Sequence, residues 1–234
     1  MSANYFRKKN FYKSIKNTKI KKPLILSSQE QKSSLTKYSE DFYQYAIIDP
    51  GPMSCGVRIE RFYFTTKRKK LIWFSILCFG NETQIINTNM DESFNFIRPF
   101  LIECHHISIE SQEMFSKVEY QFYSALIFYI TTNICNQGFR PSLYAIDVKL
   151  KTTYIGGPTN SKANGGVSIK KWTKEKALEL CIESNDAISY NILINSLSKA
   201  YEDLSDVKCY CEGWLNYVFE TDEIVTHFDK NFLR

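Results

Sequence analysis

The sequence contains no apolar run long enough to cross a lipid bilayer. No segment of its 234 residues approaches the roughly 20 consecutive apolar residues that a transmembrane helix needs. The N-terminus is polar and lacks the apolar stretch of a secretory signal. We therefore expect a soluble, intracellular protein without a membrane partner, with one well-packed domain and an added tail.

Paired cysteine motifs are also missing. The seven cysteines are scattered through apolar stretches, with no Cys-x-x-Cys pair and no cysteine and histidine spacing suited to zinc. These absences argue against a structural zinc site. We expect most of the cysteines to be buried free thiols in a reducing compartment.

Acidic residues are absent from the first 29 positions, where eight lysines and arginines lie between Arg7 and Lys22. The polar stretch SSQEQKSSLTKYSED follows at 27–41 and is typical of a linker. We predict that residues 1–40 form a basic, flexible arm and linker and that residues 41–234 form the folded domain. Such an arm can lie on nucleic acid, serve as a localisation signal or only aid solubility, and the sequence leaves these alternatives open.

From Tyr45 onward, short apolar strands and longer helical segments succeed one another. The expected elements are strands at 45–49, 55–64 and 71–80, a helix at 91–104, a strand at 105–110, a helix at 111–138, a strand at 142–151, a loop at 152–170 and three helices after it. The first three strands have short connections and are expected to be antiparallel. The last two follow helical crossovers and are expected to be parallel. The fold class is therefore α/β, with a mixed five-stranded sheet flanked by helices.

Four carboxylates occupy positions that this arrangement would bring together. Asp49 ends the apolar run YAIID just before Pro50-Gly51-Pro52, and Glu110 ends the strand HHISIE. If these strands are neighbours, both acids emerge at one edge of the sheet. Asp203 and Asp206, in EDLSD, are three residues apart on a helix and so share a face. Because clustered carboxylates repel one another, they favour a site for hard divalent cations such as Mg²⁺ or Mn²⁺.

The succession IIDPG, then ISIESQ opening a helix, then a final helix carrying EDLSD resembles the ribonuclease H-like nucleases of the RuvC Holliday junction resolvase type, in particular poxvirus-type and other large DNA virus resolvases. The resemblance covers roughly residues 44–219. It implies a ribonuclease H-like fold in which Asp49, Glu110, Asp203 and Asp206 are the catalytic residues and the ligands of two Mg²⁺ or Mn²⁺ ions per active site, with Asp49 bridging both ions.

Lysines follow the last predicted strand at high density. Lys149 and Lys151 stand at its end, and the loop and helix beyond add Lys162, Lys170, Lys171 and Lys174. We predict that these side chains contact a DNA backbone beside the acids, while a solvated strand end is the alternative for the first two.

The function implied by the resemblance is that of a metal-dependent endodeoxyribonuclease that resolves four-way (Holliday) junctions or other branched DNA and leaves a 5′-phosphate. It also implies a homodimer and a viral source, with action in the host cytoplasm or nucleus. The aromatic helix around 115–129 is consistent with a dimer contact or a DNA-facing wedge.

Two other classes of protein compete with this interpretation. An actin-like or sugar-kinase ATPase begins with a similar Asp-Gly strand hairpin but needs a second copy of it, and this chain has one. A non-catalytic nucleic-acid-binding or assembly module of the same fold stays open. It would keep the basic segments without needing all four acids.

Overall fold

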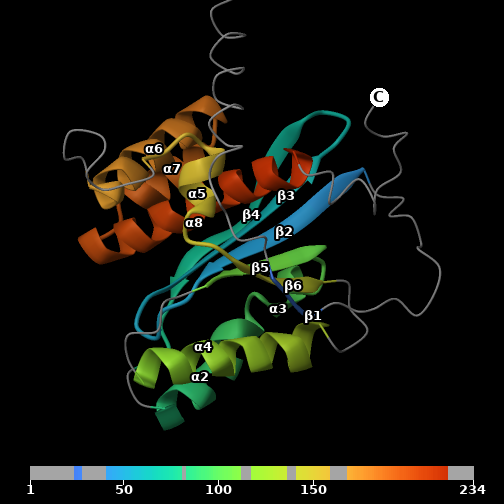
Figure 1. Cartoon of the computed structure of the whole chain (residues 1–234), viewed down its shortest axis with the longest axis vertical. Helices are drawn as coiled ribbons and strands as arrows, with labels where there is room; N and C mark the ends of the chain where they lie inside the picture. The colour runs from blue at the N-terminus through green and yellow to red at the C-terminus, as the bar shows by residue number, and fades with distance from the viewer. Residues whose placement is uncertain are drawn as a thin grey trace, which may run out of the picture.

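The strands of this protein form one mixed sheet with helices on both faces (Figure 1). The computed structural model describes residues 24–27, 41–80, 83–111, 117–135, 141–158 and 168–220. Within them, the strand order is β1-β6-β5-β2-β3-β4.

The first three strands of the folded domain are β2 (Phe42–Asp49), β3 (Cys55–Tyr63) and β4 (Arg68–Leu77). They pair antiparallel as a meander. The next strand, β5 (His106–Glu110), pairs in parallel with β2, and β6 (Ser142–Ile146) pairs in parallel with β5. The predicted mixed sheet of three antiparallel strands followed by two parallel ones is confirmed.

An additional edge strand comes from the segment predicted to be an arm and linker. Strand β1 (Leu24–Ser27) pairs antiparallel with β6 and extends the five predicted strands by one. Residues 1–23 and 28–40, on which the rest of that prediction falls, lie outside the described residues.

Helices cover the two faces of the sheet in two groups (Figure 1). One face carries α2 (Thr83–Asn95), α3 (Arg98–Leu101) and α4 (Lys117–Ile130), which continues as the π-helical turn η1 (Thr131–Cys135). The other carries α5 (Leu150–Tyr154), α6 (Ile169–Glu183), α7 (Ala187–Ile194) and α8 (Ser198–Glu220). None of the described helices is long and apolar enough to cross a membrane.

Strand β2 is apolar on both sides because it lies between two cores. Tyr45 and Ile47 pack in the core under α5–α8, whereas Ala46 and Ile48 pack in the core under α2–α4. Side chains alternate between the faces of a strand, so Asp49 continues the row of Tyr45 and Ile47. Burial of the strand thus directs this carboxylate to the side of the sheet that α8 covers.

Two predicted elements differ from the structure in extent by more than a few residues. The strand expected at 142–151 ends at Ile146, because Asp147 starts a turn: its carbonyl accepts from the Leu150 N–H at 2.9 Å and its Oδ1 from the Lys149 N–H at 2.8 Å. Helix α5 follows at once. The helix expected at 91–104 begins earlier, at Thr83, and is interrupted after Asn95, since Pro99 is accepted only in the first turn of the separate helix α3.

Candidate active site

Two of the predicted acids lie side by side at the ends of parallel strands. Ile48 of β2 is in register with Ile109 of β5, so the next residues, Asp49 and Glu110, leave the sheet together. Glu110 acts on Asp49 and raises its pKa. Both side chains therefore lie near each other on the α8 side of the sheet.

Helix α8 reaches this point because β3 presents a glycine there. Gly56 is paired with Asp49 in the sheet register. A Cβ atom at Gly56 would lie 3.0 Å from Cγ1 of Val207 and 3.1 Å from the carbonyl oxygen of Asp203. Any larger residue would push α8 away from the sheet. Gly56 therefore allows the turns of α8 that carry Asp203 and Asp206 to lie against the end of β2.

The two aspartates of α8 complete an acid cluster, which we define as Asp49, Glu110, Asp203 and Asp206. Asp203 is buried, and its Oδ1 accepts from Lys199 Nζ at 2.7 Å. Its Oδ2 accepts from the hydroxyl of Ser54, which stands in the turn after β2. Repulsion from Glu110 and Asp203 acts on Asp206. All four acids selected from the sequence thus lie on the α8 side of the sheet, near enough to act on one another's charge.

A lysine from α5 enters the same cluster. Lys151 is buried, and its ammonium group donates to Asp206 Oδ1. Burial alone would lower the pKa of Lys151, but attraction to Asp206, Glu110 and Asp49 outweighs it and raises this pKa above the usual lysine value. Lys151 therefore stays charged as an internal counterion of the acids.

Like charges and burial also change the ionisation of the acids. Burial raises the pKa of Asp49 well above its usual range, and repulsion by Glu110, their hydrogen bond and repulsion by Asp206 raise it further, while Lys151 opposes the shift. Burial also raises the pKa of Asp206, despite the lowering effect of Lys151. In the absence of a cation, Asp49 holds a proton to a higher pH than an exposed aspartate does.

The oxygen atoms of the acid cluster suit hard divalent cations, although several of these oxygens accept hydrogen bonds from other side chains. Four carboxylates supply only oxygen ligands, which suits Mg²⁺ and Mn²⁺. In the described parts of the chain, no three histidine, cysteine or acidic side chains stand grouped as a ready cation cage. Two of the acids have other partners: Asp206 accepts from Lys151, and Asp203 accepts from Lys199 and Ser54. A cation binding here would compete with these protons and ammonium groups.

The lysines predicted to bind DNA, where the structure describes them, differ in exposure and in their ion-pair partners. Lys149 is exposed before α5, whereas Lys151 lies inside the acid cluster and not at a solvated strand end. Three lysines of α6 have carboxylate partners: Lys170 and Lys174 contact Glu202, and Lys171 contacts Glu175. Lys162 lies outside the described residues.

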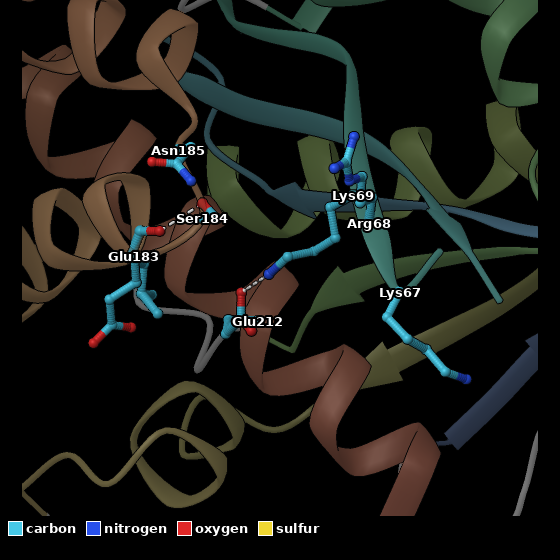
Figure 2. A pocket seen from close by; sticks show the side chains of 8 residues that line it. Lys67, Arg68, Lys69, Glu183, Ser184, Asn185 and Glu212 are labelled. Atoms are coloured by element: carbon cyan, nitrogen blue, oxygen red, sulfur yellow. Dashed lines mark hydrogen bonds and ion pairs between the residues drawn. The ribbon is translucent and has the colours of Figure 1, made fainter. Parts of the chain in front are cut away.

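A separate pocket of about 660 Å³ opens at the far end of β3 and β4 from the acid cluster. Figure 2 shows its basic side, from the turn between these strands, facing the C-terminal end of α6 and Glu212 of α8. Lys69 pairs with Glu212 in this pocket. None of the four predicted acids lines this pocket. The pocket and the acid cluster are therefore separate features.

The order of strands and the two helical layers are those of a ribonuclease H-like fold. Among solved structures, the fowlpox virus resolvase with its substrate Holliday junction DNA is similar to this chain with a TM-score of 0.51 and 15% sequence identity. The likeness covers 76% of this chain and 98% of that one. At this identity the comparison establishes the fold, and the resemblance seen in the sequence is confirmed at that level.

Two further structures are similar at lower scores. A second structure of the fowlpox virus Holliday junction resolvase has a TM-score of 0.47 at 13% identity and covers 76% of this chain and 99% of its own. RuvC of T. thermophilus in complex with a Holliday junction substrate has a TM-score of 0.44 at 12% identity and covers 76% of this chain and 96% of its own. No protein-family model and no curated protein sequence matches the chain.

Four side chains of the site were not assigned this place from the sequence. All four contact an acid of the cluster: Ser54, Lys151, Lys199 and Tyr210. Two of them carry a usable signal: Lys199 precedes Asp203 and Tyr210 follows Asp206 by four residues, and positions four apart on a helix share a face. Ser54 and Lys151 come from a turn and a short helix whose course the residue pattern does not reveal.

Proposed function

We propose that this protein is a divalent-cation-dependent endonuclease that cuts branched DNA, with four-way junctions as its main substrate. The observation that supports the proposal is the acid cluster: carboxylates from β2, β5 and α8 lie on one side of the sheet, near enough to act on one another's charge, in a fold similar to that of a junction resolvase. Mutually repelling carboxylates are costly to keep together unless they serve a cation.

In this proposal, Asp49, Glu110, Asp203 and Asp206 hold two Mg²⁺ or Mn²⁺ ions, and Asp49 is shared between them. Bound there, such ions lower the pKa of a water molecule and stabilise negative charge on the departing oxygen, which gives a 5′-phosphate product. Ser54 and Lys199 orient Asp203 through their hydrogen bonds. Lys151 limits the repulsion among the acids before a cation arrives and supplies a positive charge beside the bound phosphodiester.

The direct test uses a labelled four-way junction, the full-length protein and added Mg²⁺. We expect cleavage that stops when a chelator removes the metal, a large preference over linear duplex of the same sequence, and products whose nicks a DNA ligase can reseal. Asp203→Asn is expected to slow cleavage by about 100-fold or more, since it weakens the cation site. Glu202→Gln is the matched control, because Glu202 is the neighbouring acid but contacts Lys170 and Lys174 outside the cluster.

Each contrary result has a defined meaning. Tight junction binding without cleavage at any Mg²⁺ or Mn²⁺ concentration would refute the nuclease and leave the non-catalytic DNA-binding module. Equal cutting of junction and linear duplex would retain the nuclease and remove the selectivity for branched DNA.

We also propose that the protein acts as a homodimer through the outer face of α4. Tyr120 and Phe128 are exposed on this helix, to 55% and 70%, which is unusual for large aromatic side chains. Two symmetric cuts in a junction need two active sites, and a two-fold dimer supplies them.

Phe128→Asp should weaken self-association at least about tenfold, because an aromatic anchor at the centre of an interface contributes about 1.4 kcal/mol or more. Analytical ultracentrifugation of the full-length chain measures this. Ile188→Asp, at an equally exposed apolar position on α7, is the control and should leave the dimer intact. If Phe128→Asp stays dimeric but loses junction binding, the helix is a DNA-facing wedge and the interface lies elsewhere.

A further inference from the structure

Tyr210 of α8 lies at the centre of the acid cluster without being one of its acids. It follows Asp206 by four residues, about one helical turn, and its side chain is fully buried. Its hydroxyl donates to Glu110 Oε1 at 2.6 Å. The carbonyl oxygen of Val148 is a second acceptor at 3.2 Å. A tyrosine has only one hydroxyl proton, and the shorter contact to a carboxylate is the stronger of the two.

The ring of the same tyrosine contacts the cation of the cluster. Lys151 Nζ lies 4.6 Å from the centre of the Tyr210 ring while it donates to Asp206. Ammonium groups are attracted to the face of an aromatic ring, most strongly where water is excluded. Tyr210 thus contacts an acid of β5 through its hydroxyl and the lysine of α5 through its ring.

These contacts restrict how Glu110 and Lys151 can move. Glu110 accepts from Tyr210 through Oε1, so this oxygen is fixed by a side chain of α8. Lys151 is held between the Tyr210 ring and Asp206. Without the hydroxyl, Glu110 could turn about its side-chain bonds, and the acids would have to be ordered anew each time a cation binds.

We propose that Tyr210 is a positioning residue that fixes Glu110 through its hydroxyl and Lys151 through its ring, so that the acid cluster is ordered before it binds a divalent cation. This inference rests on the proposed function, which gives Glu110 a cation to bind. Some residues do not bind the metal but form hydrogen bonds that orient its ligands. Replacing such a residue commonly lowers metal affinity or activity by about 10 to 100-fold.

The test measures Mn²⁺ binding to the full-length protein by electron paramagnetic resonance, without DNA, and junction cleavage separately. Tyr210→Phe keeps the ring beneath Lys151 and removes only the hydroxyl. Mn²⁺ is expected to bind this variant about 10 to 100-fold more weakly, with kcat lowered and the KM for the junction unchanged. Tyr210→Leu, which also removes the ring, should weaken Mn²⁺ binding further.

Tyr45→Phe is the matched control. Tyr45 is also fully buried and also donates to a glutamate at 2.6 Å, but its partner, Glu60, is not part of the acid cluster. Both Tyr→Phe variants should lose similar thermal stability, whereas only Tyr210→Phe should lose Mn²⁺ affinity. Equal Mn²⁺ affinity of Tyr210→Phe and wild type would overturn the inference.

A double-variant comparison tests whether Tyr210 acts through Glu110. In a Glu110→Gln background, Tyr210→Phe should change Mn²⁺ affinity less than twofold, because the group that the hydroxyl fixes is already altered. A full 10 to 100-fold effect in that background would refute the positioning role. If wild type binds Mn²⁺ but cuts no junction, the proposed function fails while the Mn²⁺ comparison still decides the role of Tyr210. If wild type binds no Mn²⁺, both fail.

Discussion

Asp49→Asn is expected to slow cleavage of a four-way junction by about 1,000-fold or more while leaving the protein folded. Asp49 contacts Glu110 directly and also interacts with Asp206 and Lys151, so it is the acid most central to the cluster. Replacing a shared carboxylate by an amide removes one charged ligand, and a loss of about 4 kcal/mol in transition-state stabilisation corresponds to about 1,000-fold in rate.

The same substitution should not destabilise the fold. The amide of asparagine has nearly the size of the carboxyl group, is neutral, and can donate to Glu110, so it adds no repulsion at this position. The pKa of Asp49 is higher in the folded than in the unfolded protein, first because of burial and then because of Glu110. Such a group binds more protons when folded, so its ionisation lowers stability as the pH rises from the unfolded value near 4 through the folded pKa. Asp49→Asn has no ionisable group at this position, so it does not lose stability in this way as the pH rises.

Thermal unfolding without metal therefore checks the prediction independently of activity. Asp49→Asn should unfold at a temperature equal to or above that of wild type at neutral pH, and the difference should shrink as the pH falls toward about 4. Added Mg²⁺ should stabilise wild type more than the variant, because it binds only where the ligands are complete. Asp41→Asn is the control: Asp41 stands before the other end of β2, where its carboxylate accepts from Thr65. If Asp49→Asn cuts as fast as Asp41→Asn, the acid cluster is not the active site.

The placement of the four acids could be predicted from sequence because it depends on simple periodicities. Asp49 and Glu110 each follow an apolar run, and both runs are buried strands that end at the same edge of the sheet. Asp203 and Asp206 share one helical face. The sheet order also follows from short connections and helical crossovers, which leave few alternatives.

The contacts around the acids could not be predicted in the same way, because they depend on the backbone path of turns and short helices. Lys151 was expected on a strand facing DNA. The turn at Asp147 instead starts α5, which carries this lysine to Asp206. Gly56 has no pattern around it that marks the approach of α8, and only the distance to Val207 reveals it.

A second group of charges was not recognised in the sequence at all. Arg58 and Glu60 alternate with apolar residues in β3, a pattern that normally places polar side chains in water. Both are buried here, because helices α6–α8 cover that face of the sheet. Arg58 donates to Glu60 at 2.6 Å, to Asp186 at 2.7 Å and to Ser189 at 2.8 Å. Lys208 of α8 lies 3.7 Å from both acids.

This buried network fixes α7 and α8 against β3, and it leads to the largest expected effect on stability. Arg58→Met should lower the free energy of unfolding by about 3 to 5 kcal/mol, since it removes the ion pair of the buried Glu60 and the half-buried Asp186 and leaves Lys208 and, for Glu60, Lys69 to balance them. Arg61→Met is a close control on the same strand. Arg61 lies over the ring of Phe42 as Arg58 lies over Phe74, but its ion pair with Glu103 is more exposed. Arg61→Met should cost less, about 1 to 3 kcal/mol by urea unfolding, mainly because the buried Oε1 of Gln44 loses two donors.

The pH dependence of this loss identifies its cause. Burial would raise the pKa of Glu60, but Arg58 and Lys208 outweigh it and hold this pKa below its usual range. The resulting stability is present above the unfolded pKa, near 4.3, and is lost as the pH falls through the folded value. The gap between wild type and Arg58→Met should therefore narrow in acid. A gap that stays constant from pH near 7 to pH near 3 would mean that lost packing, and not the unpaired carboxylates, destabilises the variant.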